Sequence, residues 1–303
     1  MTDHSYDPEY VAARRVLLDA LAALHPHGPA VIVAGAQAVY LRTGSADLAV
    51  APFTTDGDLA LDPAQLGDDP RLGDAMEAAG FTLHRHQGGH LEPGVWERST
   101  AVDGRDYLIP VDLIFPEAVA AQPGRRGARL GVHGNQAARR AVGLEAALVD
   151  HDPLTIDALE PDDHRQAVVE VAGVGALLVA KAHKLHDRLQ TGRPTRLSDK
   201  DAADVFRLMQ TANSTRTAAT LGRLVVDPVA GQVTRDALRY LADLFARSAS
   251  TGVTMAVAAL QLAVPPERIA AVCNGFVANV VATRRPLGSP GPNRWPGSPA
   301  PRP

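Results

Sequence analysis

The segment FTTDGDLAL (residues 53–61) places two aspartates one residue apart at the start of a short apolar run. Side chains of an extended strand alternate between its two faces, so Asp56 and Asp58 are expected on the same face. A second apolar segment, LIPVDLIF (residues 108–115), carries Asp112. These two segments predict neighbouring strands that hold three carboxylates.

A third apolar segment, PAVIVAG (residues 29–35), ends at the small-residue turn Gly35-Ala36, and AQAVYL follows at once as a helix. A glycine between a strand and a helix lets the backbone approach a ligand closely, and the helix start presents unpaired N–H groups to a phosphate. A plain strand-to-helix turn is the alternative. Thr54 and Thr55 add hydroxyls that could reach a phosphate, although threonine is also common where strands begin.

The composition is that of an ordinary globular protein. The 303 residues are 46% hydrophobic and 21% charged with a formal net charge of -4, which suggests two domains and requires any nucleic-acid binding to rest on a local basic patch. The single cysteine, Cys273, excludes an intramolecular disulfide and suits a reducing cytosol. The polar first residues contain no signal peptide, and no apolar run approaches the ~20 residues that span a bilayer. We therefore expect a cytoplasmic protein that does not bind membranes.

Hydrophobic periodicity divides the chain near Ala172 into an α+β half and a helical half. We expect a nucleotidyltransferase-like α/β domain over residues 1–172, a helical domain over 173–284 and a disordered Pro/Gly-rich tail over 285–303. Helices are predicted at 10–24, 36–41, 71–79, 175–189, 200–209, 216–225, 234–246, 251–262 and 266–282. Strands are predicted from residue 29, around Asp56 and Asp58, at 81–86, 95–100 and 107–115, and less clearly at 128–132, 145–149 and 166–171.

Aspartate is uncommon on apolar strands, because an unpaired buried charge costs several kcal/mol. Edge or turn positions are the alternative explanation, and they suit Asp47 and Asp62. For Asp56, Asp58 and Asp112 we favour metal ligation. All three offer oxygen ligands, so Mg²⁺ or Mn²⁺ is the expected ion.

The helical half opens with LLVAKAHKLHDRLQTGRPTRLSDKDAADVFRL. At 100° per residue, Lys181, Lys184 and Arg188 share one helix face, and Asp201 and Asp204 share a face of the next helix. The cations could form surface ion pairs with the acidic pair. They could equally bind a triphosphate beside a structural or metal-coordinating carboxylate.

Two groups of histidines have spacings that suggest metal binding. His84, His86 and His90 lie across a Gly-Gly turn without a cysteine, and we expect no zinc there. His183 and His186 lack the spacing and the glutamate of a metalloprotease motif.

The pattern as a whole resembles the polymerase-beta type of nucleotidyltransferase, in which a small-residue turn precedes Asp-x-Asp and a further strand carboxylate. AKAHKLHDR followed by SDKDAADVFRL resembles the AbiEii-type nucleotidyltransferase toxins of bacterial toxin–antitoxin systems. The resemblance covers roughly residues 30 to 210. It implies a Mg²⁺-dependent transfer of a nucleotide from an NTP to an acceptor, RNA and in particular the 3′ end of tRNA, and a cognate antitoxin as partner.

The resemblance also implies roles for individual residues. Asp56 and Asp58 would bind metal, with Asp112 as third ligand or base. Gly35, Ala36 and Thr55 would lie near the triphosphate, Lys181 would contact it with Lys184 and Arg188 beside it, and Asp201 or Asp204 would complete the site. Three residues depart from the family pattern: Ala36 stands for Gly or Ser, Phe53 for a frequent arginine, and Gly57 for an apolar residue.

Two other classes of function stay open. The enzyme could modify a small molecule such as an antibiotic, which the net charge of -4 favours, whereas the arginines at 125, 126, 129, 139 and 140 favour RNA. A non-catalytic descendant that binds a nucleotide or a partner protein is the third possibility, because Ala36 and Gly57 depart from the pattern. The acceptor and the NTP cannot be identified from the sequence.

Overall fold

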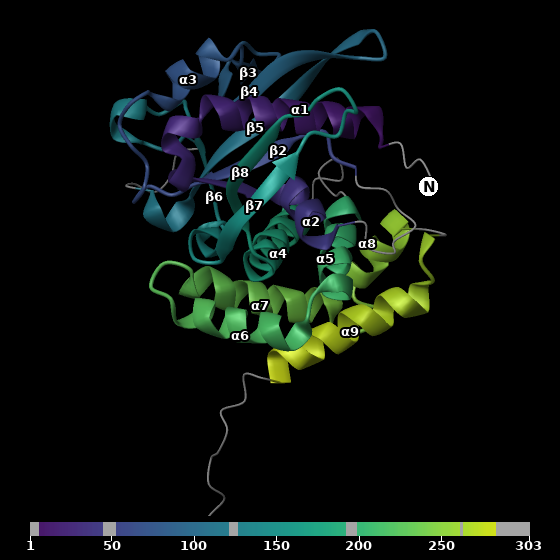
Figure 1. Ribbon diagram of the computed structural model, residues 1–303. Coiled ribbons are helices and arrows are strands. Elements are labelled where there is room, and N and C mark those ends of the chain that lie inside the picture. Colours follow the sequence, from purple (N-terminus) through teal and green to yellow (C-terminus); the bar gives the residue numbers. More distant parts are fainter. Residues whose placement is uncertain (1–5, 45–52, 121–126, 192–198, 261–262, 283–303) are drawn as a thin grey trace, which may run out of the picture.

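The computed structural model describes residues 6–44, 53–120, 127–191, 199–260 and 263–282. A mixed sheet with flanking helices forms the first half and a group of packed helices forms the second, as Figure 1 shows. The predicted α+β class is therefore confirmed. The predicted tail (285–303) and the arginines at 125 and 126 lie outside the described residues.

The sheet has the strand order β3-β4-β5-β2-β1-β8-β7, with β6 pairing to β5. Its centre combines the antiparallel pair β1–β2 with the parallel pairs β2–β5 and β1–β8. The strands are β1 (Val31–Ala34), β2 (Gly57–Leu61), β3 (Thr82–Arg85), β4 (Leu91–Val102), β5 (Arg105–Pro116), β6 (Arg139–Ala141), β7 (His151–Asp157) and β8 (Gln166–Ala172).

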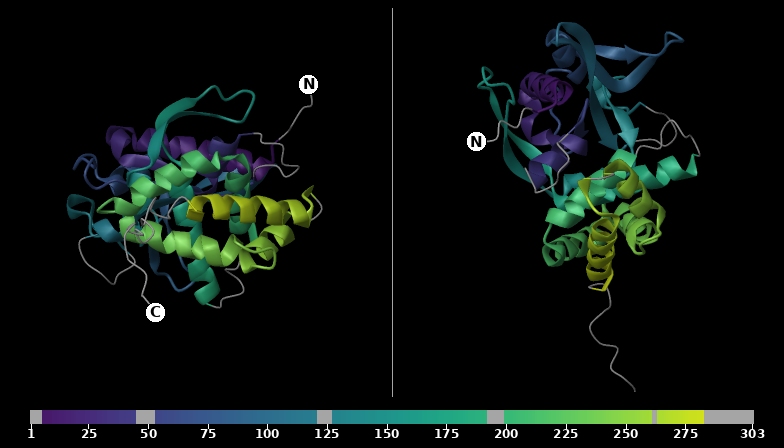
Figure 2. Two further views of the ribbon diagram at one scale, coloured as in Figure 1. Left: turned by 90° about the horizontal axis from the view of Figure 1, so that it is seen from below. Right: turned by 90° about the vertical axis from the view of Figure 1, so that its right-hand side faces the viewer.

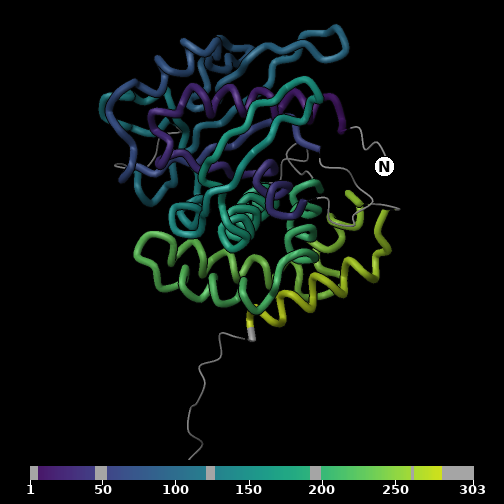
Figure 3. Tube along the Cα trace, viewed as in Figure 1, coloured from purple at the N-terminus to yellow at the C-terminus, as the bar shows by residue number. Residues whose placement is uncertain are grey.

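Helix α1 (Pro8–Ala23) lies across one face of this sheet, where it contacts β2, β4, β5 and β8 (Figures 1 and 3). Its start is set by Pro8 and by Asp7, whose carboxylate accepts a hydrogen bond from the Glu9 amide at 2.8 Å. Helix α2 (Gly35–Thr43) follows β1 directly and packs against β1, β2 and the helical half. Helix α3 (Leu72–Ala78) packs against α1.

Gly57 fixes which way the aspartates of β2 point. A Cβ atom on Gly57 would lie 3.2 Å from Leu17 of α1, so this position faces α1 and leaves little room for a side chain. Alternation along the strand therefore turns Asp56 and Asp58 to the opposite face, toward α2 and the helical half. Close packing against Leu17 explains why a glycine stands between the two aspartates.

The helical half starts directly after β8, and the right-hand view of Figure 2 shows it as a layer below the sheet. The Asp150 carboxylate accepts a hydrogen bond from the Ala176 amide at 2.8 Å and so caps the first helix of this half. Its helices are α4 (Val174–Gln190), α5 (Asp199–Thr211), α6 (Ser214–Val226), α7 (Gly231–Phe245), α8 (Thr251–Leu260) and α9 (Pro266–Ala282). The predicted helices of this half are confirmed to within a few residues over the described chain. No helix in the described ranges is long and apolar enough to cross a bilayer.

Two predicted strands are wrong. Residues 145–149 form a 3₁₀ turn instead, because Glu145 accepts hydrogen bonds from the amides of Gly143 and Ala118 at 2.7 and 3.1 Å. Residues 128–132 run into another 3₁₀ turn, because Gly131 has a φ of +58° that an extended strand does not allow.

Strand β7 is not predicted by the sequence pattern, because HDPLTID contains a proline and flanking aspartates. The structure accommodates Pro153 because β7 forms the outer edge of the sheet, where a missing amide hydrogen leaves no unpaired acceptor inside the sheet.

Trp96 of β4 packs between α3 and the segment that precedes β6. Its side chain is fully buried against Gly73 of α3, and its indole N–H donates to the Ala137 carbonyl at 2.9 Å. We expect Trp96→Ala to lower the free energy of unfolding by about 3–5 kcal/mol, the usual loss for a large buried aromatic side chain. Leu108→Ala in β5 is the matched control, because Leu108 is 61% exposed and its loss should change stability by less than ~1 kcal/mol. Urea denaturation of the three proteins measures this, and equal losses in both variants would contradict it.

Candidate active site

Asp58 and Asp112 are direct neighbours on adjacent strands. The parallel pairing of β2 and β5 puts them in register, and the antiparallel pairing of β1 and β2 puts Ala34 opposite Asp58 on its other side. Residues in register on adjacent strands share a face, so both carboxylates lie on the side away from α1. The predicted pairing of these two aspartates is a feature of the sheet itself.

Gly35 begins α2 beside the Asp58 carboxylate. Its φ is +62°, and a Cβ atom at this position would lie 1.9 Å from Asp58 Oδ2. A side chain at residue 35 is therefore excluded both by backbone conformation and by space. The start of α2, including the buried Ala36, is brought against the carboxylate that is predicted from the sequence to bind metal.

Arg139 of β6 pairs with the same carboxylates. Its Nε and Nη2 donate to Asp112 Oδ2 at 3.0 and 2.6 Å, and Nη2 lies 4.0 Å from Asp58 Oδ1. The strand β6 supplies this arginine because it pairs with β5 at Ile114, two residues beyond Asp112. Asp112 therefore forms an ion pair with the guanidinium group of Arg139.

Asp56 lies in the segment just before β2. Its Oδ1 accepts a hydrogen bond from the hydroxyl of Thr54, while Thr55, the predicted phosphate contact, is half-buried between them. Over the described residues, the carboxylate oxygens of Asp56, Asp58 and Asp112 do not all lie within 4.8 Å of one another. The strand placement therefore puts the three groups in one region without a closed three-ligand cluster.

Burial raises the pKa values of Asp58 and Asp112. It raises the pKa of Asp58 to about 6, and the charges of Asp56 and Asp112 add to the rise against those of Lys184 and Arg139. Burial also raises the pKa of Asp112, although Arg139 acts in the opposite direction. Carboxylates with this property cluster at functional sites, because the structure leaves their negative charge without full compensation.

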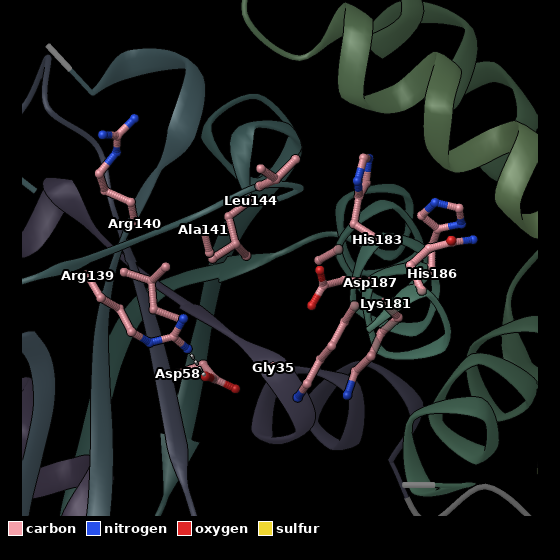
Figure 4. A pocket seen from close by; sticks show the side chains of 15 residues that line it. Gly35, Asp58, Arg139, Arg140, Ala141, Leu144, Lys181, His183, His186 and Asp187 are labelled. Atoms are coloured by element: carbon pink, nitrogen blue, oxygen red, sulfur yellow. Dashed lines mark ion pairs between the residues drawn. The ribbon is translucent and has the colours of Figure 1, made fainter. Parts of the chain in front are cut away.

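A cavity of about 640 Å³ opens between these strands and α4. Figure 4 shows Asp58 and Arg139 on one side of it, with Gly35 close to Asp58, and His183 and His186 of α4 on the other. Apolar side chains from both halves complete the wall; these are Ile114, Ala141, Val142, Leu144 and Ala180. A cavity with a few convergent polar groups on an apolar wall is typical of a small-molecule site.

The predicted cationic face of α4 and the acidic pair of α5 meet directly. Lys181 Nζ donates to Asp201 Oδ1 at 2.7 Å and to Asp204 Oδ2 at 2.6 Å, and Asp201 also pairs with Arg188 and, at 3.4 Å, with Lys184. Burial alone would lower the pKa of Lys181, but Asp204 and Asp201 raise it above the ordinary value. The shared helix faces are as predicted from the spacing.

Lys181 lines the cavity as well, but its ammonium group is engaged by Asp201 and Asp204. Its side chain is only 5% exposed, and both of its carboxylate partners are equally buried. Lys184, one turn further along α4, is 44% exposed, lines the cavity and acts electrostatically on both Asp58 and Asp112. Of the two lysines that line the cavity, Lys184 is therefore the more exposed one, and its amine is the more accessible to a ligand.

Two cations of the site were not predicted from the sequence. Arg139 was assigned only to a basic stretch, because β6 is three residues long and has no strand pattern of its own. Lys200 of α5 lies with its amine 5.7 Å from the ring centre of Phe53; burial lowers its pKa, while Asp56 and Asp204 oppose this. The SDKDAAD motif contains Lys200, but only the folded chain brings it near Asp56.

Comparisons of the chain with protein-family models, with curated proteins and with solved structures give no match.

The buried lysine should be structural. Replacing Lys181 by Ala leaves Asp201 and Asp204 buried with less compensation, so we expect a loss of about 3–5 kcal/mol in the free energy of unfolding. Lys184→Ala is the control on the same helix, with an expected change below about 1 kcal/mol because the side chain is exposed. Chemical denaturation compares the two, and a Lys181→Ala protein as stable as Lys184→Ala would contradict the assignment.

Asp58 should destabilise the fold when ionised. Its folded-state pKa of about 6 lies above the unfolded value, so stability is gained as pH falls through 6 toward 4 and is lost at higher pH. With a chelator present at pH 7.5, the free energy of unfolding of Asp58→Asn should therefore exceed that of the wild type by about 1–3 kcal/mol. This difference should disappear near pH 4. Denaturation curves at several pH values measure it. Asp106→Asn, an exposed change in β5, should show no such difference at any pH; an unchanged Asp58→Asn protein would refute the electrostatic account.

Proposed function

We propose that this protein is a Mg²⁺-dependent nucleotidyltransferase that moves a nucleoside monophosphate from an NTP to an acceptor hydroxyl. One observation carries the proposal: the side-chain-free Gly35 at the start of α2 lies against Asp58, which is in register with Asp112 and shares a cavity with Lys184. A helix start, paired carboxylates and a lysine are what the binding and transfer of a phosphate group require.

The residues fit a divalent cation of the magnesium type. Asp58 and Asp112 are carboxylates whose pKa values burial has raised, and Asp56 adds a third negative charge nearby, so a bound cation would relieve their repulsion. All the donors are oxygen atoms, which Mg²⁺ and Mn²⁺ prefer. When bound, the ion would supply charge neutralisation at the reacting phosphate.

Side chains and backbone amides of the cavity would bind the NTP and accept the proton of the attacking hydroxyl. The first backbone amides of α2 and the ammonium group of Lys184 would hold the phosphates of the NTP. Arg139 occupies Oδ2 of Asp112, so Oδ1 of Asp112 would accept the proton of the attacking hydroxyl. The hydroxyl oxygen forms the new bond to the α-phosphorus as the bond to pyrophosphate breaks. The apolar wall around Ile114 and Leu144 would take the nucleoside and exclude water.

RNA is the proposed acceptor, with the 3′ end of tRNA as the particular case, and a toxin-like role with a cognate antitoxin follows from the same resemblance. Arg139, whose side chain is 25% exposed, lines the β6 side of the cavity, and the exposed Arg129 lies in the segment that precedes β6; both cations favour a polyanionic acceptor. A second candidate function is nucleotide binding without catalysis. The ion pair between Arg139 and Asp112 favours it, because catalysis needs a free carboxylate at this position and binding does not.

Label transfer from an α-labelled NTP to total RNA, with Mg²⁺ or Mn²⁺, tests the proposal. Asp58→Asn keeps the size of the side chain but removes its charge, so we expect a rate loss of about a thousandfold, equivalent to roughly 4 kcal/mol in the barrier. Asp106→Asn should retain full activity. Equal transfer by wild type and Asp58→Asn would refute the mechanism. A wild type that binds an NTP but transfers nothing to RNA or to small hydroxyl compounds would favour the nucleotide-binding protein.

A further inference from the structure

The hairpin of β3 and β4 brings two histidines and a glutamate together away from the candidate active site. One ligand atom from each of His84, His86 and Glu92 lies within 4.8 Å of the other two. Among the described residues, no other group of three histidine, cysteine, aspartate or glutamate side chains meets this distance. The ring centres of His84 and His86 are 5.2 Å apart, and His86 Nε2 lies 2.9 Å from Glu92 Oε2. Three donors of zinc-binding type therefore converge on one point.

An irregularity in the strand pairing creates this convergence. Between the pairs Leu83–Trp96 and Arg85–Leu91, β3 has only His84, while β4 has four residues, 92–95. Such a bulge re-aims the side chains of the longer strand. Gly94 makes it possible, because its φ is +74° and a Cβ atom there would lie 2.2 Å from the Arg139 amide nitrogen. The backbone of β6 thus comes close to β4 inside the irregular segment that carries Glu92.

We propose that His84, His86 and Glu92 bind one Zn²⁺ ion, with water in the remaining position. Two imidazole nitrogens and one carboxylate oxygen form a ligand set that Zn²⁺ accepts in tetrahedral sites, whereas Mg²⁺ prefers oxygen ligands throughout. The side chains are reachable from solvent: His84 is 33%, His86 48% and Glu92 13% exposed. The ion would replace the direct His86–Glu92 contact.

Glu97 acts as a positioning residue for this site. Its Oε1 lies 2.7 Å from His84 Nδ1, so this contact orients the ring and leaves Nε2 for the metal. A carboxylate paired with the far nitrogen of a metal-binding histidine is a common way of holding the ring and raising its basicity.

The histidine spacing with its Gly-Gly turn and without a cysteine predicted no zinc here, and it pointed to His90 as the third histidine. In the structure His90 is an exposed residue of the turn, and its backbone carbonyl accepts a hydrogen bond from the His86 amide at 3.0 Å. The third ligand comes instead from Glu92, on the returning strand. His90 therefore provides a control in the same hairpin.

The experiment uses the full chain, freed of metal by a chelator and titrated with Zn²⁺ against a chromophoric competitor. Wild type and His90→Ala should each bind one Zn²⁺ per chain, whereas His84→Ala, His86→Ala and Glu92→Gln should bind at least about tenfold more weakly. Glu97→Gln should bind more weakly while keeping the same stoichiometry. Zinc should raise the melting temperature of wild type and His90→Ala and leave that of His86→Ala unchanged.

Several outcomes would overturn the proposal. It fails if the wild type binds less than one equivalent of Zn²⁺, or if the three ligand variants bind as tightly as the wild type. A loss in His90→Ala equal to that in Glu92→Gln would also refute the stated ligand set. Because Glu92→Gln changes no volume, circular dichroism of this variant separates lost binding from lost structure. Asp58→Asn should bind Zn²⁺ like the wild type, so this result is independent of the proposed transferase activity.

Discussion

The arrangement of the candidate active site depends on the buried ammonium group of Lys181. Its hydrogen bonds to Asp201 and Asp204 join α4 to α5, and Arg207 of α5 lies 5.2 Å from the ring centre of Tyr40 in α2. Since α2 leads directly from the sheet, this series of contacts connects the helical half to the strands that carry the aspartates. A buried ion pair contributes little net stability but strongly disfavours arrangements that break it. Its effect here is to hold α4 where Lys184 faces Asp58.

The carboxylates show the opposite balance of stability and function. Asp58 is mostly buried beside two other acidic groups, and burial raises its pKa to about 6, so the ionised form works against folding at neutral pH. The fold tolerates this because Arg139 and Lys184 offset part of the charge. A purely structural site would have an amide or an apolar residue at position 58, as Trp96 and Leu59 fill other buried positions of the sheet. The retained charge is the physical argument for a cation or a phosphate transfer at this site.

Local patterns in the sequence were sufficient for much of the fold and for part of the site. Apolar runs and helical periodicity predict the central strands and helices, and the period of two predicts that Asp56 and Asp58 share a face. The position of Arg139 was not predictable, because β6 is defined by its pairing with β5 and not by a pattern of its own. Nor was the burial of Lys181, since a helix face full of cations looks the same whether it meets solvent or a second helix. Both failures concern contacts between segments far apart in the chain.

The two proposed metal sites differ in the chemistry of their donors, and this difference explains how one chain can hold both. The aspartates of the candidate active site offer oxygen ligands, while the β3–β4 hairpin offers two imidazole nitrogens and one carboxylate. Harder ions prefer the first set, and zinc prefers the second. β4 passes through both regions: Val95 pairs with Asp112, and Glu92 lies just beyond the bulge at Gly94. Gly94, where the backbone of β6 comes close to β4, therefore lies in the same irregular segment as Glu92, so one stretch of one strand contributes to both sites.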